Sequence, residues 1–167
     1  MAGHDDAAES FWRFSLMVYA RPGVAEALIR LQDRGGHNVN LILFGLWLGI
    51  CEGLRLGAGQ LARAETAIAR LDSDIVMPLR RLRSALKGDP DPDVRALRRR
   101  VLALEIAAER RVQARLAATI TRRRTTRAGD REAIAEANLR LILGANFADE
   151  EAALILRAIA LFVPRFR

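Results

Sequence analysis

The sequence predicts an all-α protein: a helical bundle with a long antiparallel helical hairpin. Apolar residues recur every three or four positions along nearly the whole chain, which is the period of a helix, and no stretch alternates as a strand does. Hydrophobic residues make up 51% of the 167 residues, with only 5 prolines and 12 glycines, which excludes disordered and collagen-like chains. One cysteine and two histidines exclude an internal disulfide and argue against a multi-cysteine or histidine-rich metal centre.

The length suits a single domain, residues 1–167, in which three parts can be distinguished. Residues 7–57 predict an N-terminal part of three helices. Residues 58–127 predict a basic helical hairpin, and residues 128–167 predict a C-terminal helix pair.

The first two helices have recognisable ends. The first is expected to begin near Asp6, because Asp6 and Glu9 have the spacing of a capping box. It should end at Pro22 and the glycine after it, which disfavour a continuing helix. The second helix is expected over residues 24–34, before a pair of glycines.

The third helix is predicted over about residues 39–56, with Asn38 as its N-cap. Its first three turns are apolar on every side, and a helix of that kind is buried on every side. We therefore expect it at the centre of the globular part, with Trp47 as a core anchor. Cys51 follows the same apolar run and has no basic neighbour, so we expect an unreactive, buried thiol.

Two apolar seams, in residues 61–86 and 94–116, predict the long helices of the hairpin. Pro78 lies inside the first seam and predicts a kink or a break there. The turn at residues 87–93 is short, so the two helices should pair antiparallel. The second helix is expected to continue to about Thr125, a length of roughly 50 Å.

The excess positive charge is confined to the hairpin. Residues 78–127 hold 15 basic and 5 acidic residues, a net charge of +10, whereas residues 1–77 carry −2 and residues 128–167 carry −1. Such a field attracts an acidic protein or a nucleic-acid backbone, although a solvated helix face is the alternative explanation. The candidate partner-binding residues are Arg80, Arg81, Arg98, Arg99, Arg110, Arg123 and Arg124. No base-reading motif is present, so nucleic-acid binding would be directed at the backbone.

The alternative function is that of a small-molecule or metal-binding protein, or an enzyme, with a pocket. Its candidate lining residues are Trp12, Asn40, Trp47, Glu105 and Glu109. Glu105 and Glu109 are four residues apart and share one helix face, as paired acid–base or metal-binding carboxylates can.

A structural interpretation of the two carboxylates competes with that chemistry. An ion pair across the hairpin would place Arg70 roughly opposite Glu109 if the seams pair about Gly88. No residue pattern identifies a catalytic group, a resident metal or a cofactor, and an activity as an enzyme is the less favoured interpretation.

The sequence favours a cytoplasmic protein. The longest apolar run, residues 41–51, is shorter than the roughly 20 residues that a spanning helix needs, and the acidic N-terminus is unlike a secretory signal. Residues 152–163, with Arg157, Arg165 and Arg167, could instead lie on an anionic membrane surface, but a core helix is the favoured interpretation.

Several motifs resemble those of a known family. They are the W-x-F-S-L-x-x-Y pattern that begins at Trp12, P-G-V from Pro22, L-Q-D from Leu31 and V-N-L-x-L-F from Val39, followed by matching residues around Pro78 and Glu105. The pattern resembles a proteobacterial family of small conserved hypothetical proteins, catalogued as a domain of unknown function. The resemblance implies a cytoplasmic bacterial protein and supplies no catalytic residues.

Because the excess positive charge is confined to the hairpin, the leading hypothesis is an interaction protein whose basic hairpin docks on an anionic partner.

Overall fold

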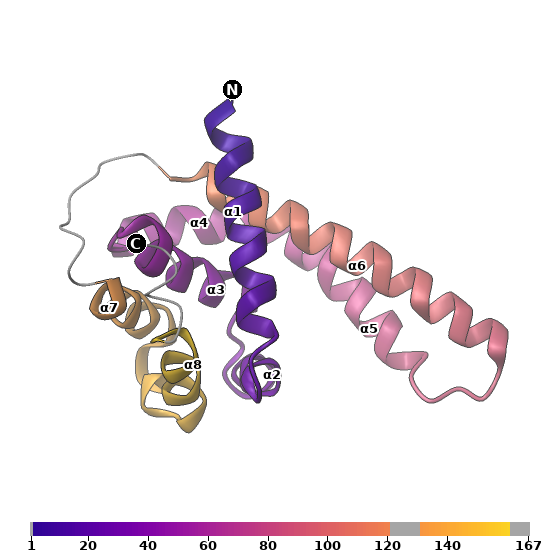
Figure 1. The fold of residues 1–167 in the computed structure, drawn as a ribbon. Helices are drawn as coiled ribbons and strands as arrows, with labels where there is room; N and C mark the ends of the chain where they lie inside the picture. The colour runs from indigo at the N-terminus through magenta and orange to yellow at the C-terminus, as the bar shows by residue number, and fades with distance from the viewer. Residues whose placement is uncertain (1, 121–130, 161–167) are drawn as a thin grey trace.

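The computed structural model describes residues 2–120 and 131–160, and within these ranges the chain is helical and contains no strand (Figure 1). The all-α prediction is confirmed. The helices are α1 (Ala2–Tyr19), α2 (Val24–Gly35), α3 (Val39–Trp47), α4 (Ala58–Leu71), α5 (Met77–Ala85), α6 (Pro92–Ala118), α7 (Arg131–Leu143) and α8 (Glu150–Ala160). Two π-helical segments, η1 (Leu48–Glu52) and η2 (Asp72–Val76), and a 3₁₀ segment, η3 (Gly144–Ala148), lie between them.

The start of α1 differs from the prediction. The helix begins at Ala2, so Asp6 lies inside it and does not form a capping box with Glu9. The Glu9 carboxylate is engaged elsewhere: it pairs with Arg13 one turn later at 3.3 Å and with Arg110 of α6 at 2.6 Å. Glu9 therefore ties α1 to α6.

The second and third helices begin where the sequence predicts. Asn38 caps α3, because its side-chain oxygen accepts hydrogen bonds from the backbone N–H groups of Asn40 at 2.9 Å and Leu41 at 3.3 Å. Gly36 ends α2 in the left-handed conformation, with φ of 68°, which glycine adopts without a steric penalty.

The centre of the core is α3, all of whose residues are buried. Trp47 is 0% exposed and stacks on Phe11 of α1 with ring centroids 5.1 Å apart. Its indole Nε1 donates a hydrogen bond to Ser10 Oγ at 3.2 Å, so the ring's polar atom is also satisfied. The predicted central position of this helix and the anchoring role of Trp47 in the core are confirmed.

The predicted third helix does not continue regularly to residue 56. It passes into η1, and the irregular backbone beyond is held by Asn138 of α7, a residue that sequence reasoning did not single out. The Asn138 side-chain NH₂ donates to the carbonyl oxygens of Gly45 and Leu54, each at 2.9 Å, and its oxygen accepts from the Leu56 N–H at 2.7 Å. A fully buried amide thus bonds the Leu54 carbonyl and the Leu56 N–H, and adds a second donor to the Gly45 carbonyl, which also accepts from the Leu48 N–H.

Helices α5 and α6 lie side by side and project away from the other helices, joined at their far end (Figure 1). The irregularity predicted at Pro78 is the π-helical turn η2, which immediately precedes α5. Helix α6 has 27 residues, about 40 Å long, and ends at Ala118 rather than continuing to Thr125. The Thr119 hydroxyl donates to the Leu116 carbonyl at 2.6 Å, and the Thr119 backbone N–H donates to the same carbonyl at 3.0 Å, so this carbonyl at the helix end is hydrogen-bonded. Thr125 itself lies outside the described residues.

The C-terminal helices complete the core. Helix α7 packs on α3 and η1, and α8 packs on α2, as Figure 1 shows for their relative positions. Ala152, Ile155 and Ile159 of α8 are buried in that contact. The apolar face considered for a membrane surface is therefore core up to Ala160, while Arg165 and Arg167 lie outside the described residues.

Candidate functional site

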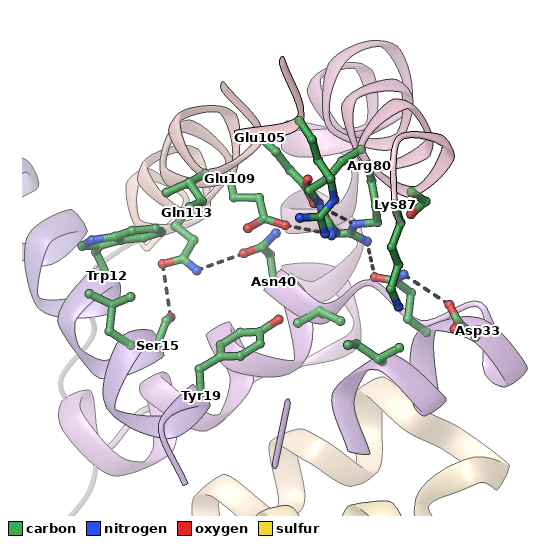
Figure 2. A pocket seen from close by; sticks show the side chains of 18 residues that line it. Trp12, Ser15, Tyr19, Asp33, Asn40, Arg80, Lys87, Glu105, Glu109 and Gln113 are labelled. Atoms are coloured by element: carbon green, nitrogen blue, oxygen red, sulfur yellow. Dashed lines mark hydrogen bonds and ion pairs between the residues drawn. The ribbon is translucent and has the colours of Figure 1, made fainter. Parts of the chain in front are cut away.

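A cleft of about 700 Å³ opens where α1, α2 and α3 meet the hairpin, and its lining extends to Lys87 in the hairpin turn (Figure 2). Four of the five predicted pocket residues line it: Trp12, Asn40, Glu105 and Glu109. Trp47 does not, and its assignment to the pocket was wrong, because its ring is enclosed by the aromatic core. These four residues belong to α1, α3 and α6, which are distant in the sequence, and the fold brings them together at the cleft.

The floor of the cleft is a chain of buried amide and hydroxyl groups. Gln113 Nε2 donates to Asn40 Oδ1 at 2.9 Å, and the Ser15 hydroxyl lies 3.2 Å from Gln113 Oε1, as drawn in Figure 2. Each of the three side chains is at most 4% exposed. A buried network with its internal bonds made holds its members in fixed positions. Sequence reasoning missed Ser15 and Gln113; their only signal is a polar side chain beside apolar seam positions.

One wall of the cleft is an ion-pair cluster between α5 and α6. Arg80 lies 3.4 Å from Glu105 and 2.6 Å from Glu109, and it also bonds to Gln32 of α2. Arg83 binds Glu105 through two nitrogens, of which Nη2 is 3.1 Å from Oε1. The ion pair expected across the hairpin therefore exists, with different partners.

Arg70 is not opposite Glu109. It is exposed and lies 3.7 Å from Asp74, four residues along its own segment. The expected register assumed an uninterrupted helix folded symmetrically about Gly88. The π-helical turn η2 separates Arg70 from α5 and changes the face that follows it, so Arg80 takes the position across from Glu109.

Burial changes the ionisation of two groups in the cleft. Desolvation raises the pKa of Glu109 above its ordinary value, and the nearby Arg80 guanidinium opposes that rise. Desolvation also raises the pKa of Tyr19 to about 12, and the Glu109 carboxylate contributes to it. The Tyr19 hydroxyl therefore stays protonated and can donate a hydrogen bond at neutral pH.

Basic groups lie on the hairpin side of the cleft. Lys87, the one lysine of the sequence, is exposed there, and Arg98 is half-buried. The Arg98 Nε–H is buried and has no acceptor within the described residues. Asp33 is the acidic neighbour on α2, where it accepts a 3.5 Å hydrogen bond from Gln32. Sequence reasoning assigned Arg98 to the outer surface of the hairpin and did not consider Lys87.

The surroundings of several potentially reactive groups restrict their chemistry. Glu105 is 4% exposed and enclosed by two guanidinium groups, so it is not a free base. Among the described residues, no group of three or more His, Cys, Asp or Glu side chains is placed to hold a metal ion. Cys51 lies away from the cleft, and burial raises the pKa of its thiol to about 12, which suppresses the reactive thiolate.

The predicted partner-binding arginines fall into separate groups. Arg80 and Arg98 line the cleft. Arg110 pairs with Glu9 and lies over the Trp12 ring, with 5.7 Å from its guanidinium carbon to the ring centroid. Only Arg81 and Arg99 remain exposed and free of ion pairs within the described part of the chain. Arg123 and Arg124 lie outside the described residues.

The exposed positions of the hairpin and of the turn before it include basic and apolar side chains. Arg100, Arg111 and Arg115 are also exposed on α6 and make no hydrogen bond or ion pair with described residues. Apolar side chains are exposed in the same segment, and we call the whole set the hairpin surface: Arg81, Arg99, Arg100, Arg111, Arg115, Ile75, Leu82, Leu97 and Leu104.

The four apolar members of the hairpin surface are regularly spaced. Ile75 and Leu82 are 44% and 47% exposed and seven residues apart, and Leu97 and Leu104 are 48% and 59% exposed with the same separation. Leu97 and Leu104 lie in the regular helix α6, where a seven-residue separation keeps side chains on one face, as in a coiled-coil seam. Ile75 lies in the π-helical turn η2, so its separation from Leu82 does not place these two side chains on one helix face. The hairpin thus carries seam positions that its own two helices leave uncovered.

In the part of the chain that the structure describes, no helix has the length and apolar character needed to cross a membrane. No curated protein and no solved structure gave a significant match. A family model for a protein of unknown function, DUF2390, matches residues 10–116, which include all residues of the cleft and of the hairpin surface. The resemblance to a family of unknown function is confirmed at that level. Because the match covers more than half of the chain, the protein belongs to the DUF2390 family of proteins of unknown function.

Proposed function

We propose that the protein is a helical interaction protein whose hairpin surface docks on a helix of an acidic partner protein. The observation that carries the proposal is the exposure of apolar side chains at seven-residue spacing among arginines that have no partner within the described residues. A partner helix with an apolar stripe and flanking carboxylates would cover the exposed apolar side chains with its stripe and pair its carboxylates with the arginines.

The apolar side chains favour a protein over a nucleic-acid backbone. Binding to phosphates requires basic groups alone, whereas the centre of a protein interface is desolvated and apolar. The hairpin surface presents four large apolar residues, each at least 44% exposed. A nucleic acid would leave them in water.

The charge favours an acidic partner over a second copy of the chain. Residues 78–120 hold eleven basic and five acidic residues, a net charge of +6. Two such hairpins would repel each other at close range, whereas a negative helix would be attracted.

The test uses two variants of the hairpin surface and matched controls. Leu82→Gln with Leu104→Gln removes apolar contact, and Arg81→Gln with Arg99→Gln removes charge. Leu141→Gln on α7, where the side chain is 37% exposed, and Arg13→Gln on α1 change the same residue types elsewhere. A protein captured from a lysate by the wild-type chain is purified and titrated against each variant.

We expect the leucine variant to weaken binding at least about tenfold and the arginine variant to weaken it mainly at low salt, with both controls unchanged. Duplex DNA is titrated in parallel. The proposal is wrong if the controls lose as much affinity as the variants. It is also wrong if duplex DNA binds more tightly than any captured protein, if only the arginine variant loses affinity for DNA, and if the logarithm of the binding constant falls with the logarithm of salt concentration by about 0.9 per phosphate contact.

A further inference from the structure

We propose that the cleft binds a small organic anion with an apolar or aromatic body. This site is independent of the hairpin surface: the cleft lies at the junction of the hairpin with α1 to α3 (Figure 2). Its volume of about 700 Å³ lies within the range of small-molecule sites, roughly 300–1,000 Å³.

The apolar body of such a ligand has a matching wall. Leu16, Tyr19, Ile29 and Ile106 line the cleft, and they are 53%, 38%, 50% and 43% exposed. These are among the most exposed large hydrophobic residues of the described chain, and they face one hollow. Water against apolar walls is displaced favourably by an apolar ligand, and a concentrated apolar surface of this kind marks a binding site.

The floor offers neutral hydrogen-bond donors. The Asn40 oxygen is taken by Gln113, and the Asn40 NH₂ makes no hydrogen bond within the described residues. Neither does the Tyr19 hydroxyl, which Figure 2 shows extending toward the interior of the cleft. Because Gln113 and Ser15 hold Asn40 in place, its free donor is already oriented before a ligand arrives.

The charges decide how the ligand is oriented. The Glu109 carboxylate lies beside the floor donors and would repel an anion there, so a neutral acceptor such as a carbonyl or hydroxyl oxygen belongs at that end. On the hairpin side, Lys87 and Arg98 make no ion pair with described residues, and the Arg98 Nε–H lacks an acceptor. Asp33 is the one acidic residue of the lining beyond the ion-pair cluster. The anionic group of the ligand is therefore expected at Lys87 and Arg98.

The test uses fluorescent probes that separate the body from the charge. The sulfonate 8-anilinonaphthalene-1-sulfonate has an aromatic body and an anion, N-phenyl-1-naphthylamine has a similar body without the anion, and inorganic phosphate is an anion without the body. They are titrated against the wild type, against Lys87→Met with Arg98→Met, and against a control, Arg81→Met with Arg99→Met. The control removes the same net charge from the hairpin outside the cleft.

We expect the sulfonate to bind the wild type saturably at one site and about tenfold more weakly to the cleft variant, with no change in the control. Binding of N-phenyl-1-naphthylamine should be equal in all three proteins, and phosphate should not displace either probe. Because Arg98 is half-buried, Lys87→Glu alone provides a second variant at an exposed position, with the same direction of effect.

The inference is overturned by any of three results with folded protein: no saturable binding of the sulfonate, equal loss in the cleft variant and the control, or unchanged affinity in both cleft variants. Displacement of the sulfonate by phosphate at a similar concentration would also overturn it, because the apolar body would then contribute nothing. These outcomes leave the docking proposal untouched, since its variants lie on the hairpin surface.

Discussion

Glu105 and Glu109 stand one helical turn apart on α6, and yet their surroundings differ. Glu105 is enclosed by Arg80 and Arg83, so its charge is balanced by two guanidinium groups. Within the described residues Glu109 forms an ion pair with Arg80 alone, at 2.6 Å, and its burial outweighs the attraction of Arg80 and Arg83. The two carboxylates suggested a reactive pair from their spacing; in the structure each is held by arginine, in unequal surroundings.

The raised pKa of Glu109 gives a pH dependence with a defined sign. The ordinary pKa of a glutamate is 4.5, and the pKa of Glu109 in the folded protein is higher. Between these two pKa values the folded protein binds the Glu109 proton more tightly than the unfolded chain does. The contribution of Glu109 to stability therefore falls as the pH rises from 4.5 through the pKa of the folded state. The free energy of unfolding of the wild type minus that of Glu109→Gln should therefore decrease from pH 4.5 upward. Urea denaturation over a pH series measures it, and a difference that increases with pH would contradict the burial argument.

Trp47 illustrates a residue whose role is set by packing. Because its ring is 0% exposed and stacks on Phe11, Trp47→Ala should cost about 3–5 kcal/mol of unfolding free energy. Trp12→Ala is the matched control, since Trp12 lies at the cleft and is only partly buried, and its cost should be smaller. Chemical denaturation of both variants tests the difference; equal costs would be inconsistent with α3 as the centre of the core.

At the scale of elements, irregular turns determine which helix faces meet. The π-helical turns η1 and η2 interrupt segments that have a continuous helical period in the sequence. After η2, α5 presents Arg80 and Arg83 to α6, and this register assembles the wall of the cleft. Within η1, the chain approaches α7 closely enough that only glycine fits at the contact.

Gly49 is that contact. A Cβ atom at residue 49 would lie 2.4 Å from the backbone of Ala135 in α7, and a helix backbone cannot yield as a flexible side chain can. Gly49→Ala should therefore lower the free energy of unfolding by about 1–3 kcal/mol, the usual cost of overpacking.

Gly59 in α4 is the control for this prediction, because a Cβ there meets no atom within 4 Å. Gly59→Ala should leave stability unchanged or raise it by up to about 1 kcal/mol, since alanine favours the helix. Thermal and urea unfolding of the two variants provide the measurement. Similar effects at both positions would show that α7 does not approach η1 so closely.

At the scale of the whole molecule, the described residues form a helical core and a projecting basic hairpin (Figure 1). The cleft is lined by residues of both. Its charge is distributed unevenly: residues 78–120 alone carry a net +6 of the formal +7 of the chain. Like charges on the exposed α5 and α6 repel, and that repulsion is reduced by salt.

This distribution predicts how stability responds to charge removal. Replacing Arg81, Arg99, Arg100, Arg111 and Arg115 with Gln should leave the fold intact, because each side chain is exposed and surface changes usually stay within about 0.5 kcal/mol. The melting temperature should rise above that of the wild type at about 10 mM salt, and the gain should vanish near 1 M. Circular dichroism melts at both salt concentrations test this, and a lower melting temperature at low salt would show that these arginines contribute attractive contacts.

The sequence by itself determined the helical fold, the positions of α2 and α3, the buried core around Trp47 and the basic character of the hairpin. These follow from hydrophobic period, capping residues and composition, which are properties of neighbouring positions along the chain. Of the five residues that the sequence suggested for a pocket, Trp12, Asn40, Glu105 and Glu109 line the cleft and Trp47 does not.

Only the tertiary structure decided the contacts between distant segments. Arg80 in place of Arg70 as the partner of Glu109, Lys87 and Arg98 in the cleft, and Asn138 bonded to the backbone around η1 all depend on helix register and on π-helical turns. The one extra residue in a π-helical turn rotates every later side chain about the helix axis by about 100°. The hydrophobic period of the sequence does not reveal such a rotation. Side-chain reach and burial then decide, among many arginines of equal sequence appearance, which complete an ion pair and which make none within the described residues.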